Sequence, residues 1–309
     1  MSGKNDVSKI SPQELHRKIE QNDPFVLIDV QLNDYYNMGH LPGARNACVF
    51  EVVFIDNVSK IVSEKDREIV VYGSSGKSMD ALTAAQKLAR AGYKKVRALG
   101  GGILEWSSLG FGIEGEEEAI KPDSEVPISI DDKTYMIDLE QSVIAWTGRN
   151  PNTRHHGTVQ LSKGEILVHN GQIEGTFEID MKSIKNINLE GDPLQPILVS
   201  HLMSDDFFFV DIFPKATFTI TSARQIKDAT PTEPNFEVKG IFELRGIKKE
   251  TAFVAIAGPT TEGEVKIEAH FDIDRTGWKI IYGSRRFFEH LGMHLVFDSI
   301  SIQLYFVAR

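Results

Sequence analysis

Hydrophobic residues follow different periods in the two halves of the chain. In the first part, apolar runs of strand length alternate with segments whose apolar residues recur at helical spacing. Apart from Asp29, Arg67 and Glu68, the runs at residues 24–30 and 67–73 are apolar without alternation, which is typical of parallel strands that are buried on both faces. One helix is expected to begin at Ser11, with this serine as N-cap and Pro12 in the first turn, and a second is expected over residues 78–90. The apolar face of the second helix is expected to contain Met79, Leu82, Ala85 and Leu88. This pattern predicts an α/β domain with a parallel sheet.

In the second half of the chain, apolar and polar residues alternate strictly. Residues 173–182, 265–274 and 300–306 each show this period of two, which indicates antiparallel strands with one dry face and one wet face. Glycine-containing turns are expected between such strands, at Lys163-Gly164, Asn170-Gly171 and Arg245-Gly246. The series favours a closed antiparallel β-barrel or a sandwich.

A segment without either period separates the two patterns. Residues 114–132 are acidic and contain proline, which is typical of a linker. The predicted organisation is therefore an α/β domain over residues 1–114, a linker over residues 115–132 and an all-β domain over residues 133–309.

Length and composition agree with two water-soluble domains. The chain has 309 residues, of which 41% are hydrophobic and 25% are charged. No apolar stretch approaches the roughly 20 residues of a membrane span, and the polar N-terminus lacks a signal-peptide pattern. We therefore expect a cytoplasmic protein without an integral membrane segment.

Charge and potential metal ligands exclude further classes of function. The net charge is −10: residues 1–115 hold 14 basic and 14 acidic residues, and the remainder holds 20 and 30. Because an acidic surface repels a phosphate backbone, we expect no nucleic-acid binding. Cys48 is the single cysteine, which excludes a disulfide framework and a cysteine-rich metal site. No metal-ligand spacing connects the histidines His155, His156, His201 and His294, so no metal site is expected.

A loop with the character of an anion site joins the strand at residues 67–73 to the following helix. Backbone N–H groups and the helix dipole at such a junction attract anions. A phosphate-binding P-loop would require glycine five residues before Gly76, where this chain has Val71, so that interpretation fails.

Several motifs of the first domain, taken in order, resemble the rhodanese (sulfurtransferase) family. The resemblance covers about residues 8–114 and rests on Leu27-Ile28-Asp29-Val30, Gly39-His40-Leu41-Pro42-Gly43-Ala44-Arg45-Asn46, the junction at residues 70–78, Ala91-Gly92-Tyr93, and Leu99-Gly100-Gly101-Gly102 followed by Trp106. In that family a cysteine that carries persulfide sulfur opens the active loop, and the equivalent residue here is Gly73. The arginine usual after Asp-Val is replaced by Gln31.

This glycine removes the chemistry of sulfur transfer, which needs a thiolate. Ser74 and Ser75 lie in the loop without a base nearby in the sequence, and Cys48 is expected to be a buried core thiol. We therefore expect no enzyme activity. Two roles stay open for the degenerate loop Gly73, Ser74, Ser75, Gly76, Lys77 and Ser78 and its domain: docking or dimerisation, or binding of a small oxyanion by the loop backbone with Lys77 and Ser78.

Motifs of the second domain resemble the YceI-like family. They are Thr134-Tyr135-Met136-Ile137-Asp138, His201 to Phe209, Phe213-Pro214-Lys215-Ala216-Thr217-Phe218, residues 240–246 and residues 271–278, in family order over about residues 133–309. The resemblance implies a lipocalin-like barrel associated with polyisoprenoid binding. Fourteen of the 18 phenylalanines follow residue 115, so an apolar lining is plentiful. The expected wall residues are Trp146, Phe177, Ile179, Phe207, Phe208, Phe218, Phe242, Phe271, Trp278 and Phe306.

Three further features are expected near the ends of this barrel. A short helix capped by Ser204 or Asp205 would carry the following phenylalanines across one end, as a lid or as a plug. Asp274 and Arg275 are expected to form an ion pair. The pair Arg285-Arg286 is a candidate site for an anionic lipid headgroup.

The leading hypothesis is that the barrel carries or sequesters a slender hydrophobic molecule, either a polyisoprenoid or an isoprenoid quinone. No cofactor is required, and the first domain would act as a docking or regulatory module that binds a protein partner or a second copy of the chain. The alternatives are a stress-related scaffold whose barrel is filled by its own side chains, and a sulfurtransferase-type enzyme that uses Ser74 or Cys48.

Overall fold

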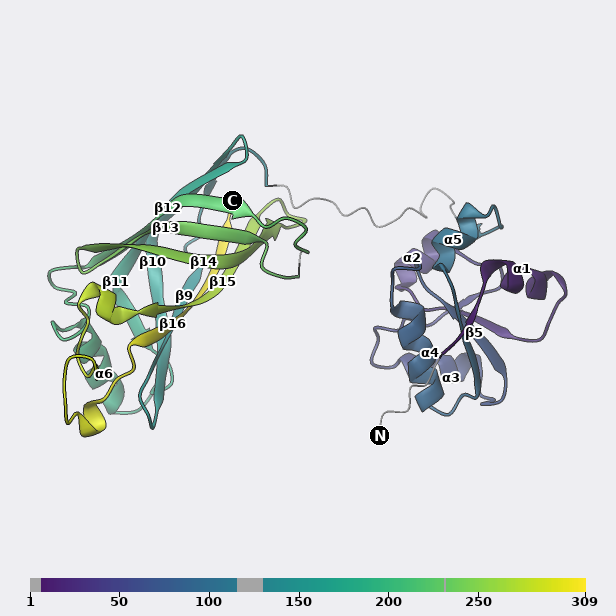
Figure 1. The fold of residues 1–309 in the computed structure, drawn as a ribbon, viewed down its shortest axis with the longest axis horizontal. Helices are drawn as coiled ribbons and strands as arrows, with labels where there is room; N and C mark the ends of the chain where they lie inside the picture. The colour runs from purple at the N-terminus through teal and green to yellow at the C-terminus, as the bar shows by residue number, and fades with distance from the viewer. Residues whose placement is uncertain (1–6, 116–129, 231) are drawn as a thin grey trace. The chain divides into compact units, whose positions relative to one another are not determined.

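The computed structural model describes residues 7–115, 130–230 and 232–309. It divides into two compact units, Met1–Glu125 and Val126–Arg309, which are treated separately below (Figure 1). The predicted linker lies outside the described residues except at its ends, and Gly115 at one of these ends pairs with Gly39 of the first unit. Within the described residues, no helix is both long enough and apolar enough to cross a membrane.

The first unit contains the predicted parallel sheet. Its five strands lie in the order β1-β6-β5-β2-β4, and every neighbouring pair is parallel. Their bounds are β1 Ser8–Ile10, β2 Val26–Asp29, β4 Arg45–Asn46, β5 Glu68–Tyr72 and β6 Lys95–Leu99. A short antiparallel ribbon is added by β3 (Gly39–His40) and β7 (Glu114–Gly115).

Helices cover both faces of this sheet. They are α1 Pro12–Glu20, α2 Asn33–Met38, α3 Phe54–Ile61, α4 Asp80–Arg90 and α5 Gly102–Ser108. Alternate residues of β5 face opposite cores: Ile69 and Val71 pack with α3 and α4, whereas Val70 and Tyr72 pack with α1 and α5. The sheet is therefore buried on both faces, as its continuous apolar runs predict.

The predicted start of α1 is confirmed, whereas the predicted start and apolar face of α4 need correction. The Ser11 hydroxyl accepts a hydrogen bond from the Glu14 N–H at 3.1 Å, which is the predicted N-cap. The helix expected from residue 78 begins at Asp80, and its buried face contains Ala81, Ala84, Ala85 and Leu88. Met79 precedes the helix and is exposed, so it does not belong to the predicted face.

The second unit is a closed antiparallel barrel of eight strands, β9 to β16. Each strand pairs with the next along the chain, and β16 pairs with β9 to close the ring. The strands are β9 Val143–Arg149, β10 Arg154–His169, β11 Gln172–Asn186, β12 Lys215–Gln225, β13 Phe236–Leu244, β14 Ile247–Pro259, β15 Val265–Asp274 and β16 Ser299–Ala308. A further short strand, β8 (Thr134–Met136), pairs with β10 beyond the part that contacts β9.

Two of the three predicted turns are tight hairpins. Asn170-Gly171 joins β10 to β11 and Arg245-Gly246 joins β13 to β14, and all four residues have positive φ, as a two-residue type I′ turn requires. The third prediction is wrong, because Lys163-Gly164 lies inside β10. There the register shifts, and Ile137 lies so close that a Cβ on Gly164 would be 2.6 Å from its Cγ1. Glycine is needed at this point for close packing and not for chain reversal.

One end of the barrel is covered by segments that follow β11 and β15 in the sequence, and both strands run towards that end. Because strand direction alternates around the barrel, β9, β11, β13 and β15 finish at the same end. Helix α6 (Leu194–Met203) follows β11, and the short 3₁₀ turns η2 (Arg275–Trp278) and η3 (Gly292–His294) follow β15 (Figure 1). The helix predicted to begin at Ser204 or Asp205 is not formed, because Ser204 instead ends α6 with extended backbone.

Candidate functional site: the barrel interior and the loop at Gly73

An apolar cavity occupies the barrel interior at the end away from α6. Its volume, counted as the space that the centre of a water molecule can occupy, is about 120 Å³. A cavity that holds one water needs only about 10–15 Å³ of such space. The predicted wall residues that line it are Phe177, Ile179, Phe218, Phe242, Phe271 and Phe306. This part of the barrel is therefore not filled by its own side chains.

Aromatic rings give this cavity much of its wall. Phe253 and Phe271 stack with ring centroids 4.3 Å apart, and Phe177 and Phe306 stack at 5.4 Å. Phe218 joins the two pairs, since it lies 5.6 Å from Phe253 and 6.4 Å from Phe177. The rings hold one another in place and present an apolar surface to the interior.

A second cavity, of about 330 Å³ by the same measure, lies at the α6 end. Three more of the predicted residues, Trp146, Phe207 and Phe208, line it. The two cavities share wall residues, namely Ile144, Ile179, Phe242, Phe271 and Leu304. The two cavities therefore lie next to each other along the barrel, on either side of these shared residues.

Polar side chains are concentrated in the second cavity. His201 Nε2 lies 3.0 Å from Asp206 Oδ2, and the Tyr282 hydroxyl lies 3.0 Å from His294 Nδ1. The His201 ring also packs edge-on against Tyr282. Tyr282 and His294 belong to a segment without a regular period, so the strand pattern of the sequence could not place them in the cavity wall.

Trp278 is the one predicted wall residue that lines neither cavity. It lies in η2, after β15 has ended, so strand alternation no longer sets the direction of its side chain. Its indole N–H donates to the Phe242 carbonyl at 3.2 Å, and its ring packs edge-on against Phe242. Trp278 thus supports a wall residue from outside the cavity.

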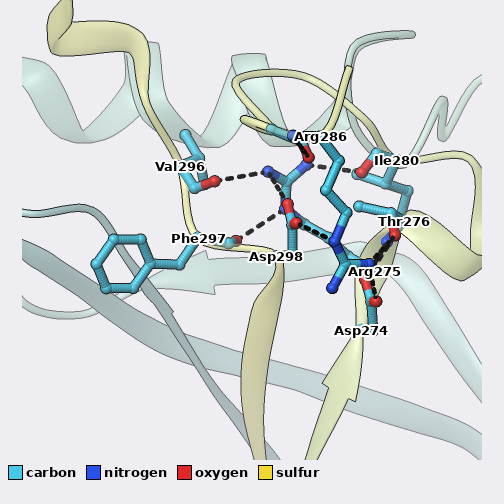
Figure 2. A network of polar contacts seen from close by, with 9 residues as sticks. Asp274, Arg275, Thr276, Ile280, Arg286, Val296, Phe297 and Asp298 are labelled. Atoms are coloured by element: carbon cyan, nitrogen blue, oxygen red, sulfur yellow. Dashed lines mark hydrogen bonds and ion pairs between the residues drawn. The ribbon is translucent and has the colours of Figure 1, made fainter. Parts of the chain in front are cut away.

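A buried arginine fixes the segment that covers the α6 end (Figure 2). The Arg275 side chain is 2% exposed and donates to the carbonyls of Ile280, Val296 and Phe297 at 2.6, 3.0 and 3.0 Å. Burial lowers the pKa of Arg275, and the nearby charges of Asp298 and Asp274 oppose that shift. Because the three acceptors lie on both sides of η3, the guanidinium holds the whole segment together.

The predicted ion pair between Asp274 and Arg275 is wrong, since Asp274 pairs with Arg286 (Figure 2). Burial acts to raise the pKa of Asp274, but hydrogen bonds from Thr276 and Arg286 hold it below its usual value. Arg286 Nε also lies 3.2 Å from Asp298 Oδ2. Arg286 is therefore occupied by two carboxylates, which argues against the predicted headgroup site at Arg285-Arg286.

The loop that begins at Gly73 holds a buried carboxylate. A Cβ built on Gly73 would lie 2.0 Å from Cγ of Asp80. The Asp80 side chain is 7% exposed, with Oδ2 accepting from the Ser74 N–H at 3.0 Å and Oδ1 from the Ala81 N–H at 2.7 Å. Backbone donors that an external anion would use are thus taken by the protein itself.

The side chains of Ser75 and Ser78 make local hydrogen bonds. Ser75 Oγ accepts from the Lys77 N–H at 3.3 Å, and Ser78 Oγ accepts from the Asp80 N–H at 3.4 Å. The Lys77 side chain is exposed, and Cys48 is buried. The negative charge of Asp80 inside the loop argues against the oxyanion alternative. Among the residues that the structure describes, no cluster of His, Cys, Asp and Glu could hold a metal ion.

Gln31, which stands where an arginine is usual, binds a second buried carboxylate. Its backbone N–H donates to Asp29 Oδ1 at 2.8 Å and its side-chain amide donates to Oδ2 at 3.2 Å. Burial raises the pKa of Asp29 in spite of these bonds. Burial also raises the pKa of the neighbouring Tyr72 far above its ordinary value, so its hydroxyl stays neutral and accepts from the Leu41 N–H.

Comparison with known proteins identifies relatives of both units. The rhodanese-like domain model matches residues 11–109 and the YceI-like domain model matches residues 135–308. Thiosulfate sulfurtransferase 18 of Arabidopsis thaliana is 33% identical over 102 residues, which cover 29% of this chain and 73% of that protein.

Two solved structures align with the second unit. BcnA of Burkholderia cenocepacia aligns with a TM-score of 0.45 and 17% identity, over 56% of this chain and 99% of BcnA. A polyisoprenoid binding domain from Saccharophagus degradans aligns with a TM-score of 0.40 and 10% identity, over 57% and 97% of the two chains. The YceI-like domain model matches more than half of the residues of this chain. The chain therefore belongs to the YceI-like family, and it carries a rhodanese-like domain N-terminal to the barrel in the sequence.

Proposed function

We propose that the barrel binds a slender hydrophobic molecule, a polyisoprenoid or an isoprenoid quinone, and carries or sequesters it. The observation that carries this proposal is the pair of neighbouring cavities inside a closed eight-stranded barrel. An eight-stranded barrel has room for its own side chains or for one small ligand, and here an apolar interior is left open.

The distribution of polar groups supports an amphiphilic ligand. We call the cavity at the end away from α6 the inner cavity and the one at the α6 end the outer cavity. The inner cavity offers almost only apolar contacts, so burial of a prenyl chain there would supply most of the affinity, at about 25 cal/mol per Å². His201, Tyr282 and His294 in the outer cavity provide hydrogen-bonding groups for a polar end. A tail in the inner cavity and a head in the outer one satisfy both environments.

Native mass spectrometry of the freshly purified chain, followed by organic extraction, tests this proposal. The expected result is one isoprenoid molecule per chain, whose mass names the cargo. A bare protein that also stays bare after incubation with prenyl alcohols and prenyl quinones would favour the scaffold alternative.

We propose further that the rhodanese-like domain is a docking module and not an enzyme. Its loop has Gly73 in place of the nucleophile and Asp80 in the adjoining space. Exposed apolar side chains also follow the carboxyl ends of β2, β4 and β5, which meet at one edge of the parallel sheet: Leu32, Phe50, Val52, Val53 and Met79. Phe50 is 72% exposed, which favours a protein surface as its partner.

Two measurements test this second part. The native chain is expected to transfer no sulfur from thiosulfate to cyanide, and measurable turnover would contradict a non-catalytic domain. Cross-linking in cells with a photoreactive residue at Val52 should capture a protein, whereas the same residue at Lys94, an exposed position in the turn before β6, should not.

A further inference from the structure

Exposed apolar side chains surround the α6 end of the barrel. Leu194 and Ile197 project from α6, and Phe287, Phe288 and Met293 belong to the segment between η2 and β16. All five are exposed, with Met293 reaching 89%. We call these five residues the apolar collar.

The collar borders the outer cavity. Leu198, His201 and Leu202 of α6 line the cavity from one side, and Met293 and His294 line it from the other while being exposed themselves. The contact between His201 and Tyr282, with ring centroids 4.7 Å apart, joins the two segments. Figure 1 places α6 and the yellow segment that follows β15 at the same end of the barrel. The cavity therefore opens among apolar side chains.

The sequence of α6 does not fit a helix that simply covers a core. Apolar residues lie on both its inner and its outer side: Leu198, Val199, Leu202 and Met203 pack against the core, whereas Leu194 and Ile197 are exposed. A helix that is apolar all round normally has all its faces withdrawn from water. Its outer face, with Ile197 beside Pro196 and Ser200 in a shallow depression, thus lacks a covering layer within the described chain.

The charged residues near the apolar collar indicate which kind of lipid surface it could contact. The segments next to α6 carry the acidic residues Glu190, Asp192, Asp205, Asp206 and Asp211. On the other side, residues 279–297 carry Lys279, Arg285 and Arg286 against Glu289, and Arg286 is paired with Asp274 and Asp298. Residues 187–213 and 279–297 together hold six acidic and three basic residues. An anionic lipid surface would be repelled by this balance, whereas an uncharged one would not.

We propose that the apolar collar docks on the surface of a neutral phospholipid bilayer, where the barrel takes up and releases its cargo. This inference rests on the proposed function, since a prenyl chain that passes directly between bilayer and cavity does not have to cross water. Apolar side chains at the lipid boundary would supply the attraction, as they do for interfacial helices.

Vesicle flotation of the full chain tests the proposal, with vesicles of pure phosphatidylcholine and of phosphatidylcholine mixed with phosphatidylglycerol. The test variant is Ile197→Gln/Phe287→Gln, which changes two collar residues that line neither barrel cavity. The matched control is Leu167→Gln/Val254→Gln, which changes two exposed apolar residues of the barrel strands β10 and β14.

The native chain and the control should float with pure phosphatidylcholine, and the collar variant should bind roughly tenfold less or weaker still. Phosphatidylglycerol should not increase binding. The proposal is overturned if the native chain stays at the bottom, if the collar variant floats equally well, or if binding needs the anionic lipid. It is also overturned if light scattering finds a native dimer that the collar variant breaks, because the collar would then bind a second copy.

Lipid extraction from the same purified samples separates this proposal from the proposed function. A native chain that retains cargo but does not float contradicts only the docking surface. A collar variant that floats less but still retains cargo supports both.

Discussion

The carboxylate of Asp80 lies where a side chain on residue 73 would begin. Its Cγ is 2.0 Å from the position that a Cβ on Gly73 would take, and the Ser74 and Ala81 N–H groups hold it there. The glycine at residue 73 and the carboxylate that fills the loop are thus two parts of one arrangement. Returning a side chain to residue 73 would require Asp80 to move and to give up both hydrogen bonds.

A double-mutant cycle on these two residues should reveal strong coupling. Gly73→Ala is expected to lower the free energy of unfolding of the first unit by about 1–3 kcal/mol through overpacking, and by much less in an Asp80→Ala background. Denaturant unfolding followed by Trp106 fluorescence, in a Trp146→Phe/Trp278→Phe chain, measures this. Gly112→Ala is the control, because a Cβ there meets no atom within 4 Å. Additive effects of Gly73→Ala and Asp80→Ala would contradict the arrangement.

Narrowing the inner cavity should remove the cargo. Ala257 lines that cavity on β14, so Ala257→Phe places a ring where the prenyl chain is proposed to lie, and retained lipid should fall about tenfold or more. Val254→Phe introduces the same ring at an exposed position of the same strand and should retain the lipid. Extraction and mass spectrometry measure retention, and circular dichroism verifies that both variants fold. Equal retention by the two variants would place the ligand elsewhere.

Removing the buried guanidinium should loosen the segment that covers the α6 end. Arg275→Met leaves three carbonyls without their donor and leaves Asp298 with Arg286 alone as ion-pair partner, which is expected to cost about 2–4 kcal/mol of unfolding free energy. Hydrogen–deuterium exchange of residues 280–297 should rise together with this loss. Arg286→Gln, which breaks exposed ion pairs only, should have a much smaller effect. Unchanged exchange in Arg275→Met would show that other contacts hold the segment.

The buried carboxyl of Asp29 should make the stability of the first unit depend on pH. Its pKa is raised in the folded chain, so between the unfolded value of about 3.9 and the folded value the folded state holds a proton that the unfolded state has lost. The free energy of unfolding should therefore fall as pH rises through this window. Asp29→Asn cannot titrate, so the difference between the native chain and this variant, measured by denaturant unfolding at several pH values, isolates the effect. A constant difference across that window would contradict it.

Residues on regular strands could be placed from the sequence because alternation fixes their direction. Phe177, Ile179, Phe242 and Phe271 were predicted to face inwards and do line the cavities. Trp278 could not be placed in this way, since it lies beyond the end of β15 where alternation no longer applies.

Contacts between residues that are far apart in the sequence were harder to predict, because no local pattern marks them. The dipeptide Lys163-Gly164 resembles Asn170-Gly171 as a turn signal, but its glycine makes room for Ile137 from another segment. In the sequence, Asp80 is an ordinary acidic residue in the first turn of a helix. Only the folded loop brings its carboxylate against Gly73.

Quenching of Trp146 fluorescence by a prenyl quinone would test most directly whether the barrel interior receives the ligand. Trp146 lines the outer cavity, whereas Trp106 belongs to the other unit and Trp278 lines neither cavity, so a Trp106→Phe/Trp278→Phe chain reports from the cavity wall. The account predicts saturable quenching at one quinone per chain, which is lost when Ala257→Phe is added. Absence of quenching, or equal quenching in the presence of Ala257→Phe, would contradict a ligand inside the barrel.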